Sequence, residues 1–243
     1  MIDDKFYLTD NIFVEDNCFK IIKNNKEKLI TNLNWHHYLD LIGWNKLYKP
    51  WILKLNKYSE NKLKNSPFAY IDCGEEGNCL FHCVAYAKSN IMNNEILTQK
   101  DIRKNLANNI SNEMFNNIIE IYRIMEDYDD FEEDWNPSKI NSLDDFKKEL
   151  ILGGNNYWGD HIIIQLLSKT LKLNFLILNT NFIENIYEKY NLLQEYDPKN
   201  KTIILIYLDL NHFQLFGYYK NNMMQYLFDD NNLPIEIRKY FSL

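Results

Sequence analysis

The sequence predicts an α/β fold of the α+β type, in which a small central mixed sheet is flanked by helices. Apolar residues recur at helical spacing in three early segments, 80–85, 102–110 and 115–122. Two later segments, 202–208 and 212–219, are rich in β-branched and aromatic residues. Helical stripes and β-forming runs along one chain are typical of helices that pack on a sheet.

The helices of the middle of the chain have recognisable boundaries. Thr98, with Asp101 three residues later, resembles a capping box and predicts the start of a helix. A second helical pattern covers 115–122, and the acidic run 126–134 follows it. Such a run is either a solvated loop or a surface that receives a basic substrate, and both interpretations stay open.

The last third of the chain predicts a crossover and a hairpin. Asp160 is a candidate N-cap for a helix over 162–167, and 175–178 is a short apolar run typical of a buried strand. Residues 202–219 are predicted to form a β-hairpin, with His212 at the start of its second arm.

The N-terminal section, residues 1–65, is predicted to be a helical, aromatic-rich extension, and 66–243 the main domain. Three tryptophans, Trp35, Trp44 and Trp51, indicate short helices that pack through large aromatic side chains. The section is either a layer that covers the core or a surface that binds a partner.

Charge and composition exclude several classes of function. The chain has 243 residues, is 46% hydrophobic and carries a net charge of −7, with its basic residues scattered. We therefore expect neither nucleic acid nor membrane as a partner, because no basic stripe and no apolar run of membrane-spanning length is present. The acidic N-terminus does not resemble a signal peptide. Four cysteines cannot staple a chain of this size, so an intracellular, cytoplasmic location is expected; they are Cys18, Cys73, Cys79 and Cys83.

Cys79 is the candidate nucleophile. It follows a Gly77-Asn78 turn and begins an apolar helical pattern, so its sulfur should lie near the free N–H groups of a helix N-terminus. Those donors favour a thiolate, and loop N–H groups of 76–79 could stabilise an oxyanion. The alternative is an ordinary buried cysteine.

His212 is the candidate base. It follows Cys79 by about 133 residues, a spacing found in papain-like proteases. A strand edge holds an imidazole more rigidly than a loop does, which suits a general base. A structural histidine on a hairpin is the alternative.

A zinc site is a weaker reading of the same region. Cys73, Cys79, His82 and Cys83 lie within eleven positions, but no C-x-x-C pair is present. We therefore expect no metal site.

The segment Gly77-Asn78-Cys79-Leu80-Phe81 resembles the nucleophile motif of the OTU (ovarian tumour) cysteine proteases, which typically reads Asp-Gly-Asn-Cys-Leu-Phe. Tyr157-Trp158-Gly159-Asp160, its helix and strand 175–178 are similar to the family's Trp-Gly segment. The strand 202–208 and Asn211-His212-Phe213 are similar to its final strand and catalytic histidine. The resemblance covers about 67–220 and is specific because the pieces occur in the family's order.

This resemblance implies a papain-like OTU fold and a deubiquitinase that cleaves the isopeptide bond at ubiquitin's C-terminal glycine. Cys79 would be its nucleophile and His212 its base, with Gly77 and Asn78 in the oxyanion loop. The aromatic rings of Trp158 and Phe213 would be walls of a narrow channel for the Gly-Gly end. No cofactor is needed, and the acidic run would suit ubiquitin's basic tail.

Two departures leave the third catalytic residue open. Glu76 stands where the family has Asp, and Gln214 stands where Asn or Asp usually orients the imidazole. A carboxamide can serve, since Cys-His-Asn sites are active, but Glu76, Asp72 or Asp209 could take the role instead.

The predicted function is thus a deubiquitinating thiol protease. The chain uses Asn, Ile and Lys heavily, which is typical of an AT-rich genome. This composition would fit a viral or parasite effector that acts on host ubiquitin. Two alternatives are a protease for a ubiquitin-like modifier and a non-catalytic ubiquitin-binding module with a degenerate site.

Overall fold

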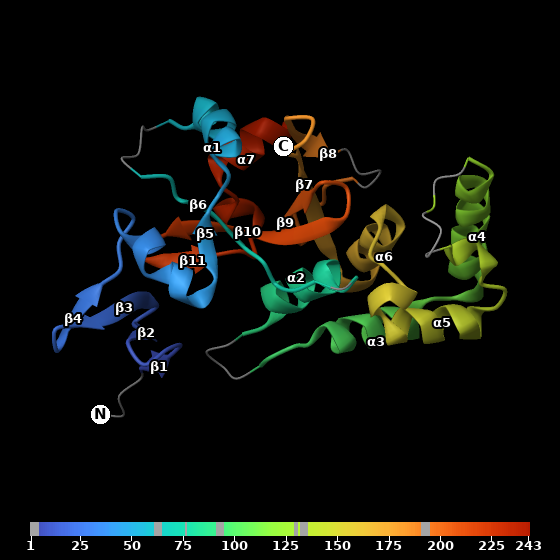
Figure 1. Ribbon diagram of the computed structural model, residues 1–243, viewed down its shortest axis with the longest axis horizontal. Coiled ribbons are helices and arrows are strands. Elements are labelled where there is room, and N and C mark those ends of the chain that lie inside the picture. The colour runs from blue at the N-terminus through green and yellow to red at the C-terminus, as the bar shows by residue number, and fades with distance from the viewer. Residues whose placement is uncertain are drawn as a thin grey trace. The chain divides into compact units, whose positions relative to one another are not determined.

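The computed structural model describes residues 5–60, 65–75, 77–90, 95–128, 131, 136–190 and 195–243 (Figure 1). The chain divides into two compact units. The sheet unit comprises Met1–Asp72, Asn174–Asn191 and Glu195–Leu243, and the helical unit is Cys73–Leu173. The division falls between Asp72 and Cys73, so it does not coincide with the predicted boundary at residue 65.

The main sheet of the sheet unit contains seven strands among the described residues. Its order is β5(Trp44–Lys46), β6(Phe68–Ile71), β10(His212–Lys220), β9(Lys201–Leu208), β7(Leu173–Asn181) and β8(Ile186–Tyr190), and β11(Met223–Gln225) pairs with β10. The predicted hairpin 202–219 is confirmed as β9 and β10, which pair His212 with Leu208. The predicted strand 175–178 lies within β7.

Two helices cover a face of this sheet, α1(Lys49–Leu55) and α7(Ile235–Phe241) (Figure 1). They form a hydrophobic core with the sheet, in which Trp51 of α1 joins side chains of the strands such as Phe68, Ile204 and Phe216. The indole Nε1 of Trp51 donates to Thr180 Oγ1 at 2.7 Å inside this core. Burying large apolar side chains against the sheet is what holds α1 there, since a helix this short is not stable by itself.

The predicted helical N-terminal extension is wrong for residues 5–30. They form an antiparallel sheet of β1(Phe6–Tyr7), β2(Ile12–Glu15), β3(Cys18–Lys23) and β4(Lys26–Leu29). Asp16-Asn17 and Asn24-Asn25 take positive φ angles between the strands, as two-residue hairpin turns require. The short helices expected around the tryptophans occur later, as turns at Trp35–His37 and Leu39–Ile42 and as α1.

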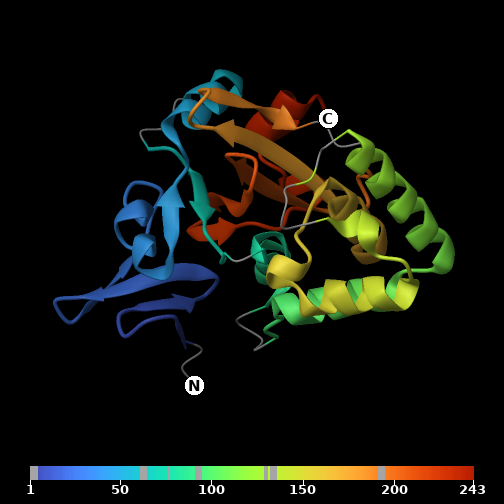
Figure 2. The ribbon, with the colours of Figure 1, turned by 45° about the vertical axis from the view of Figure 1, so that its right-hand side comes forward.

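The helical unit consists of α2(Cys79–Lys88), α3(Gln99–Asn109), α4(Asn112–Asp127), α5(Leu143–Leu152) and α6(His161–Leu171). Figure 2 shows α3 and α5 side by side, and α3 also packs on α2. The predicted capping box of Thr98 and Asp101 is confirmed at the start of α3. Asp160 caps α6 as predicted, because its Oδ1 accepts from the Ile163 amide at 2.8 Å. In the part of the chain that the structure describes, no helix has both the length and the apolar character to cross a bilayer.

Candidate active site

The surroundings of His212 are determined by the register of two strands in the sheet unit. β10 and β6 are antiparallel neighbours with Leu215 opposite Ile71, so Asp72, one residue beyond β6, comes opposite Gln214. His212 lies two residues before Gln214 and therefore on the same face of the sheet. The result is a hydrogen-bonded cluster at the end of the two strands.

Asp72 Oδ2 is the centre of this cluster. It lies 2.9 Å from His212 Nε2 and accepts from Gln214 Nε2 at 3.1 Å. The side chains of His212 and Asp72 are 21% and 42% exposed, whereas the residue Gln214 is only 6% exposed. A carboxylate just beyond the end of β6 thus contacts the imidazole, and Gln214 contacts that carboxylate.

The partner of the imidazole determines its tautomer. An ionised carboxylate can only accept hydrogen bonds, so His212 Nε2 carries the proton of the contact with Asp72. In the neutral ring, Nδ1 is then the nitrogen without a proton. Nδ1 is the atom that can act as a base, and the imidazolium formed there would be stabilised by Asp72.

Tyr48 completes the cluster from the residue just before α1. Its hydroxyl donates to Gln214 Oε1 at 2.8 Å. Burial is the main reason why the pKa of this phenol is raised above its ordinary value, and the nearby Tyr70 adds to the effect. The hydroxyl therefore stays protonated, and remains a donor, over the whole range in which a histidine titrates.

The candidate nucleophile Cys79 lies in the helical unit. Cys79 is the first residue of α2 and is 7% exposed. The amide N–H of Asn78 is committed to Glu75 O at 3.3 Å. The amide of Cys79, in contrast, belongs to the first turn of the helix, whose N–H groups have no intrahelical acceptor. It can therefore point to a negative oxygen.

Gly77 has a backbone that other residues resist. Its φ is +72°, and a Cβ there would lie 2.4 Å from Gly154 O and 2.7 Å from Trp158 Cδ1. The position needs glycine both for its left-handed conformation and for the close approach of the 153–154 turn. The structure thus brings Trp158, a predicted channel wall, beside the oxyanion loop.

Arg103 of α3 is fully buried and holds this loop in place through hydrogen bonds. Its guanidinium donates to Asn78 Oδ1 at 3.1 Å and to Gly77 O at 3.0 Å. It also donates to Leu150 O at 3.1 Å and to Tyr157 O at 3.0 Å. Asn78 Oδ1 accepts a further bond from Gly154 N at 3.0 Å. One cation therefore ties together the three segments that surround Cys79.

The charge of Arg103 acts on its neighbours. Burial lowers the pKa of Arg103 to about 10, while attraction to Tyr157 and to Cys79 opposes that decrease. The guanidinium carbon lies 3.7 Å from the centre of the Phe81 ring, a cation–π contact that helps to compensate desolvation. Burial first, and Arg103 second, lower the pKa of His82, which favours its neutral form.

The other predicted site residues have different surroundings. Phe213 is buried, and its ring stacks on Tyr207 with centroids 4.6 Å apart, so its role as a channel wall stays a prediction. Glu76 and most of the acidic run lie outside the described residues. Glu126, at the start of that run, accepts from Asn136 and Ser138 at 2.9 and 2.6 Å.

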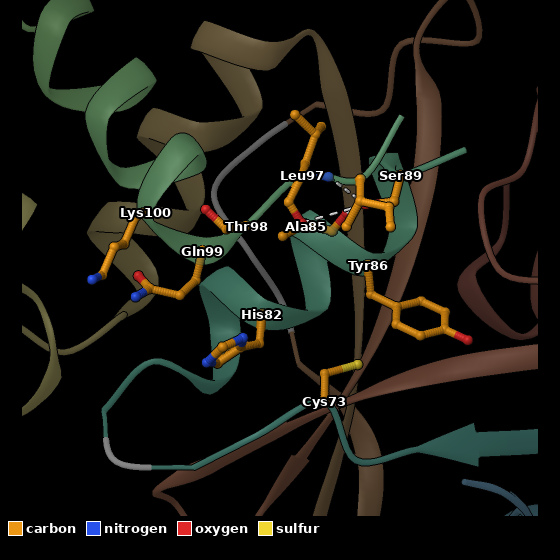
Figure 3. A pocket seen from close by; sticks show the side chains of 10 residues that line it. Cys73, His82, Ala85, Tyr86, Ser89, Leu97, Thr98, Gln99 and Lys100 are labelled. Atoms are coloured by element: carbon orange, nitrogen blue, oxygen red, sulfur yellow. Dashed lines mark hydrogen bonds between the residues drawn. The ribbon is translucent and has the colours of Figure 1, made fainter. Parts of the chain in front are cut away.

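A pocket of about 600 Å³ opens beside α2 in the helical unit. Figure 3 shows His82 and Tyr86 of α2, Cys73 and the first turn of α3 around it. Cys79 is not among its lining residues, so this pocket is separate from the predicted nucleophile. Among the described residues, no group of three or more His, Cys, Asp or Glu side chains is placed to hold a metal ion.

Sequence reasoning missed Arg103 and Tyr48. Arg103 is a single arginine in a helical pattern, and no neighbouring residue indicates that it is buried. The signal that could have identified it is the Gly77-Asn78 turn, whose polar groups need a buried donor. Tyr48 stands in a section that lies outside the motifs. Asp72 was one of three candidate carboxylates, and only the strand register singles it out.

A profile of the OTU-like cysteine protease family matches residues 75–219, more than half of the chain. No curated protein matches it. Among solved structures, an ovarian tumour (OTU) domain in complex with ubiquitin is 18% identical, with a TM-score of 0.42 over 70% of this chain and 78% of that one. An OTU deubiquitinase from Wolbachia pipientis wMel is 15% identical, with a TM-score of 0.39 over 76% and 98%. The Hazara virus OTU bound to ubiquitin is 18% identical, with a TM-score of 0.36 over 61% and 80%.

Proposed function

This chain belongs to the OTU-like cysteine protease family, and on that premise we propose that it is a deubiquitinating thiol protease. Cys79 is the nucleophile, His212 the general base and Asp72 the carboxylate that orients the imidazole. The single observation that carries the proposal is the 2.9 Å contact between Asp72 Oδ2 and His212 Nε2. A histidine held in this way has one defined basic nitrogen, which a purely structural histidine does not need.

The reaction follows from the assigned tautomer. His212 Nδ1 takes the proton of the Cys79 thiol, and the thiolate attacks the carbonyl carbon of the scissile isopeptide bond. The tetrahedral oxyanion collapses to a thioester as the C–N bond breaks, and the imidazolium gives its proton to the leaving lysine amine. Water, deprotonated by the same nitrogen, then attacks the thioester and releases a carboxylate and the thiol.

The loop around Gly77 supplies the stabilisation of charge. In the proposed reaction the Cys79 amide donates to the oxyanion, because the amide of Asn78 is already bonded to Glu75 O. Arg103 holds the loop in that position through Gly77 O and Asn78 Oδ1. Trp158 beside Gly77 forms one wall for the two small glycines that precede the cleaved bond.

Ubiquitin is the substrate that membership of this family favours. We propose that the protein acts inside cells and is a viral or parasite effector directed at host ubiquitin. Its heavy use of Asn, Ile and Lys agrees with such a source. A ubiquitin-like modifier with the same tail would undergo the same chemistry.

The test is covalent labelling with a ubiquitin that carries a thiol-reactive group at its C-terminus. We expect an adduct with the parent protein, none with Cys79→Ala, and an undiminished adduct with Cys83→Ala, which removes a thiol one turn further along α2. Loss of labelling in His212→Ala would support the base. A folded parent that is not labelled would overturn the proposal, and the probe built on a ubiquitin-like modifier, or a binding measurement, would then identify the alternative.

A further inference from the structure

Gln214 has a defined orientation between two partners of opposite character. Its Nε2 lies 3.1 Å from Asp72 Oδ2 and its Oε1 lies 2.8 Å from the Tyr48 hydroxyl. A carboxylate can only accept, so the amide must turn its NH₂ group to Asp72. Its oxygen then needs a donor on the opposite side, and the phenol of Tyr48 is that donor.

The Asp72 carboxylate distinguishes the two orientations of the amide, and the Tyr48 hydroxyl then holds the amide oxygen. If the Gln214 amide turned by 180°, its oxygen would face the carboxylate of Asp72, and its NH₂ group would face the phenol. Tyr48 could accept from that group as readily as it now donates, but the two oxygens at Asp72 would repel each other. The carboxylate thus selects the orientation in which Asp72 keeps a donor on the atom that contacts His212, and the bond from Tyr48 keeps the amide in its place.

Tyr48 is itself held firmly. Its ring stacks on Tyr70 with centroids 4.8 Å apart and meets the edge of Phe182 at 5.0 Å. It is the N-cap residue of α1, and the buried bond from Trp51 to Thr180 anchors that helix to β7. The phenol has little freedom to move with a displaced amide. Its hydroxyl therefore holds the Gln214 oxygen in one position.

We propose that Tyr48 is a positioning residue for His212, acting through Gln214 and Asp72. Its consequence for catalysis rests on the proposed function. Tyr48 and Asp72 both precede the matched segment 75–219, so residues on the N-terminal side of that segment take part in orienting the imidazole. The N-terminal section then has a role in the reaction besides covering the core.

Removal of the hydroxyl has a specific expected effect. In Tyr48→Phe the ring contacts remain, but Gln214 Oε1 loses its donor and the amide can rotate away from Asp72. The carboxylate is then less fixed, and the neutral imidazole populates both tautomers. We expect kcat to fall about threefold to tenfold, the effect of one ordinary hydrogen bond, while KM stays the same because Tyr48 contacts no substrate.

The experiment measures the tautomer and the kinetics of the full-length protein. The ¹⁵N shifts of the two ring nitrogens of His212 report which one carries the proton in the neutral form. Kinetics use ubiquitin with a fluorogenic C-terminal amide. The matched control is Tyr196→Phe, which also loses a part-buried hydroxyl bond of 2.8 Å, to Asp230, near the Thr202 end of β9.

Expected are a single Nε2–H tautomer in the parent and in Tyr196→Phe, and a mixture with lower kcat in Tyr48→Phe. In a Gln214→Met background, Tyr48→Phe should have no further effect, because the residue through which it acts is absent. An unchanged tautomer and kcat in Tyr48→Phe, or losses that simply add in the double variant, would overturn the proposal. If the parent does not cleave ubiquitin, the proposed function fails, but the tautomer measurement still decides the role of Tyr48.

Discussion

His212 Nε2 and Asp72 Oδ2 lie 2.9 Å apart although 140 positions separate the two residues in the chain. The contact exists because β6 and β10 are neighbours in one register, which places Asp72 beside the histidine face of β10. A shift of the register by one residue would turn Asp72 to the other face of the sheet. The contact between Asp72 and His212 therefore depends on the register of the sheet. The contribution of Asp72 to catalysis can be tested separately from that of Gln214.

The first prediction ranks these two residues. Asp72→Ala should lower kcat/KM for a ubiquitin amide about a hundredfold or more, because the imidazole loses its tautomer and its counter-charge. Gln214→Ala should cost no more than about tenfold, since it removes only a bond to the carboxylate. Steady-state kinetics of both variants check the order, and a larger loss for Gln214→Ala would make the amide the third catalytic residue.

A second prediction concerns the buried cation below the loop. Arg103→Met should lower the free energy of unfolding by about 3 kcal/mol, because it removes the guanidinium donor from three buried carbonyls and one of the two donors of Asn78 Oδ1. Lys104→Met, the exposed neighbour on α3, is the control and should change it by less than about 0.5 kcal/mol. Urea denaturation of the two variants measures the difference, and equal values would mean that Arg103 does not support the loop.

Gly77→Ala separates backbone collision from backbone strain. Its new Cβ would lie 2.4 Å from Gly154 O, so the loop must move, and labelling by the ubiquitin probe should slow about a hundredfold. Gly43→Ala is matched in strain, with φ +90°, but its Cβ meets only the Ile71 side chain at 3.2 Å. That variant should be less stable yet label at the parental rate. Equal labelling rates for both would show that the position of Gly77 is not critical.

The fourth prediction is a dependence of stability on pH. Burial and the charge of Arg103 lower the pKa of His82 below its ordinary 6.5 in the folded protein. The unfolded chain therefore binds the His82 proton more readily than the folded protein does. Above about pH 6.5 the ring is neutral in both states and leaves the free energy of unfolding unchanged, whereas that free energy decreases as the pH falls through and below this value. His82→Gln should therefore flatten the decline of Tm between pH 7.5 and 5. A decline as steep as that of the parent would exclude His82 as its source.

Local signals were enough for many elements of the fold. The capping box at Thr98, the N-cap Asp160 and the hairpin 202–219 depend on residues close together in the chain, and all three are confirmed. The N-terminal sheet was not predicted, because the three tryptophans of that section indicate short helices that pack through aromatic side chains. Its own signals, two Asx pairs between short alternating runs, were present in the sequence and were given too little weight.

The sequence by itself determined which residues can carry the chemistry. A thiol after a Gly-Asn turn and a histidine at the start of a strand are local patterns, and the turn at Gly77 has the left-handed backbone that only its residue type allows without strain. Only the tertiary structure decided which groups surround them. Asp72 rather than Gln214 contacts the imidazole because of a strand register, and Arg103 supports the loop because α3 packs beneath it. Register and packing arise from contacts between distant segments, and a single sequence does not display them.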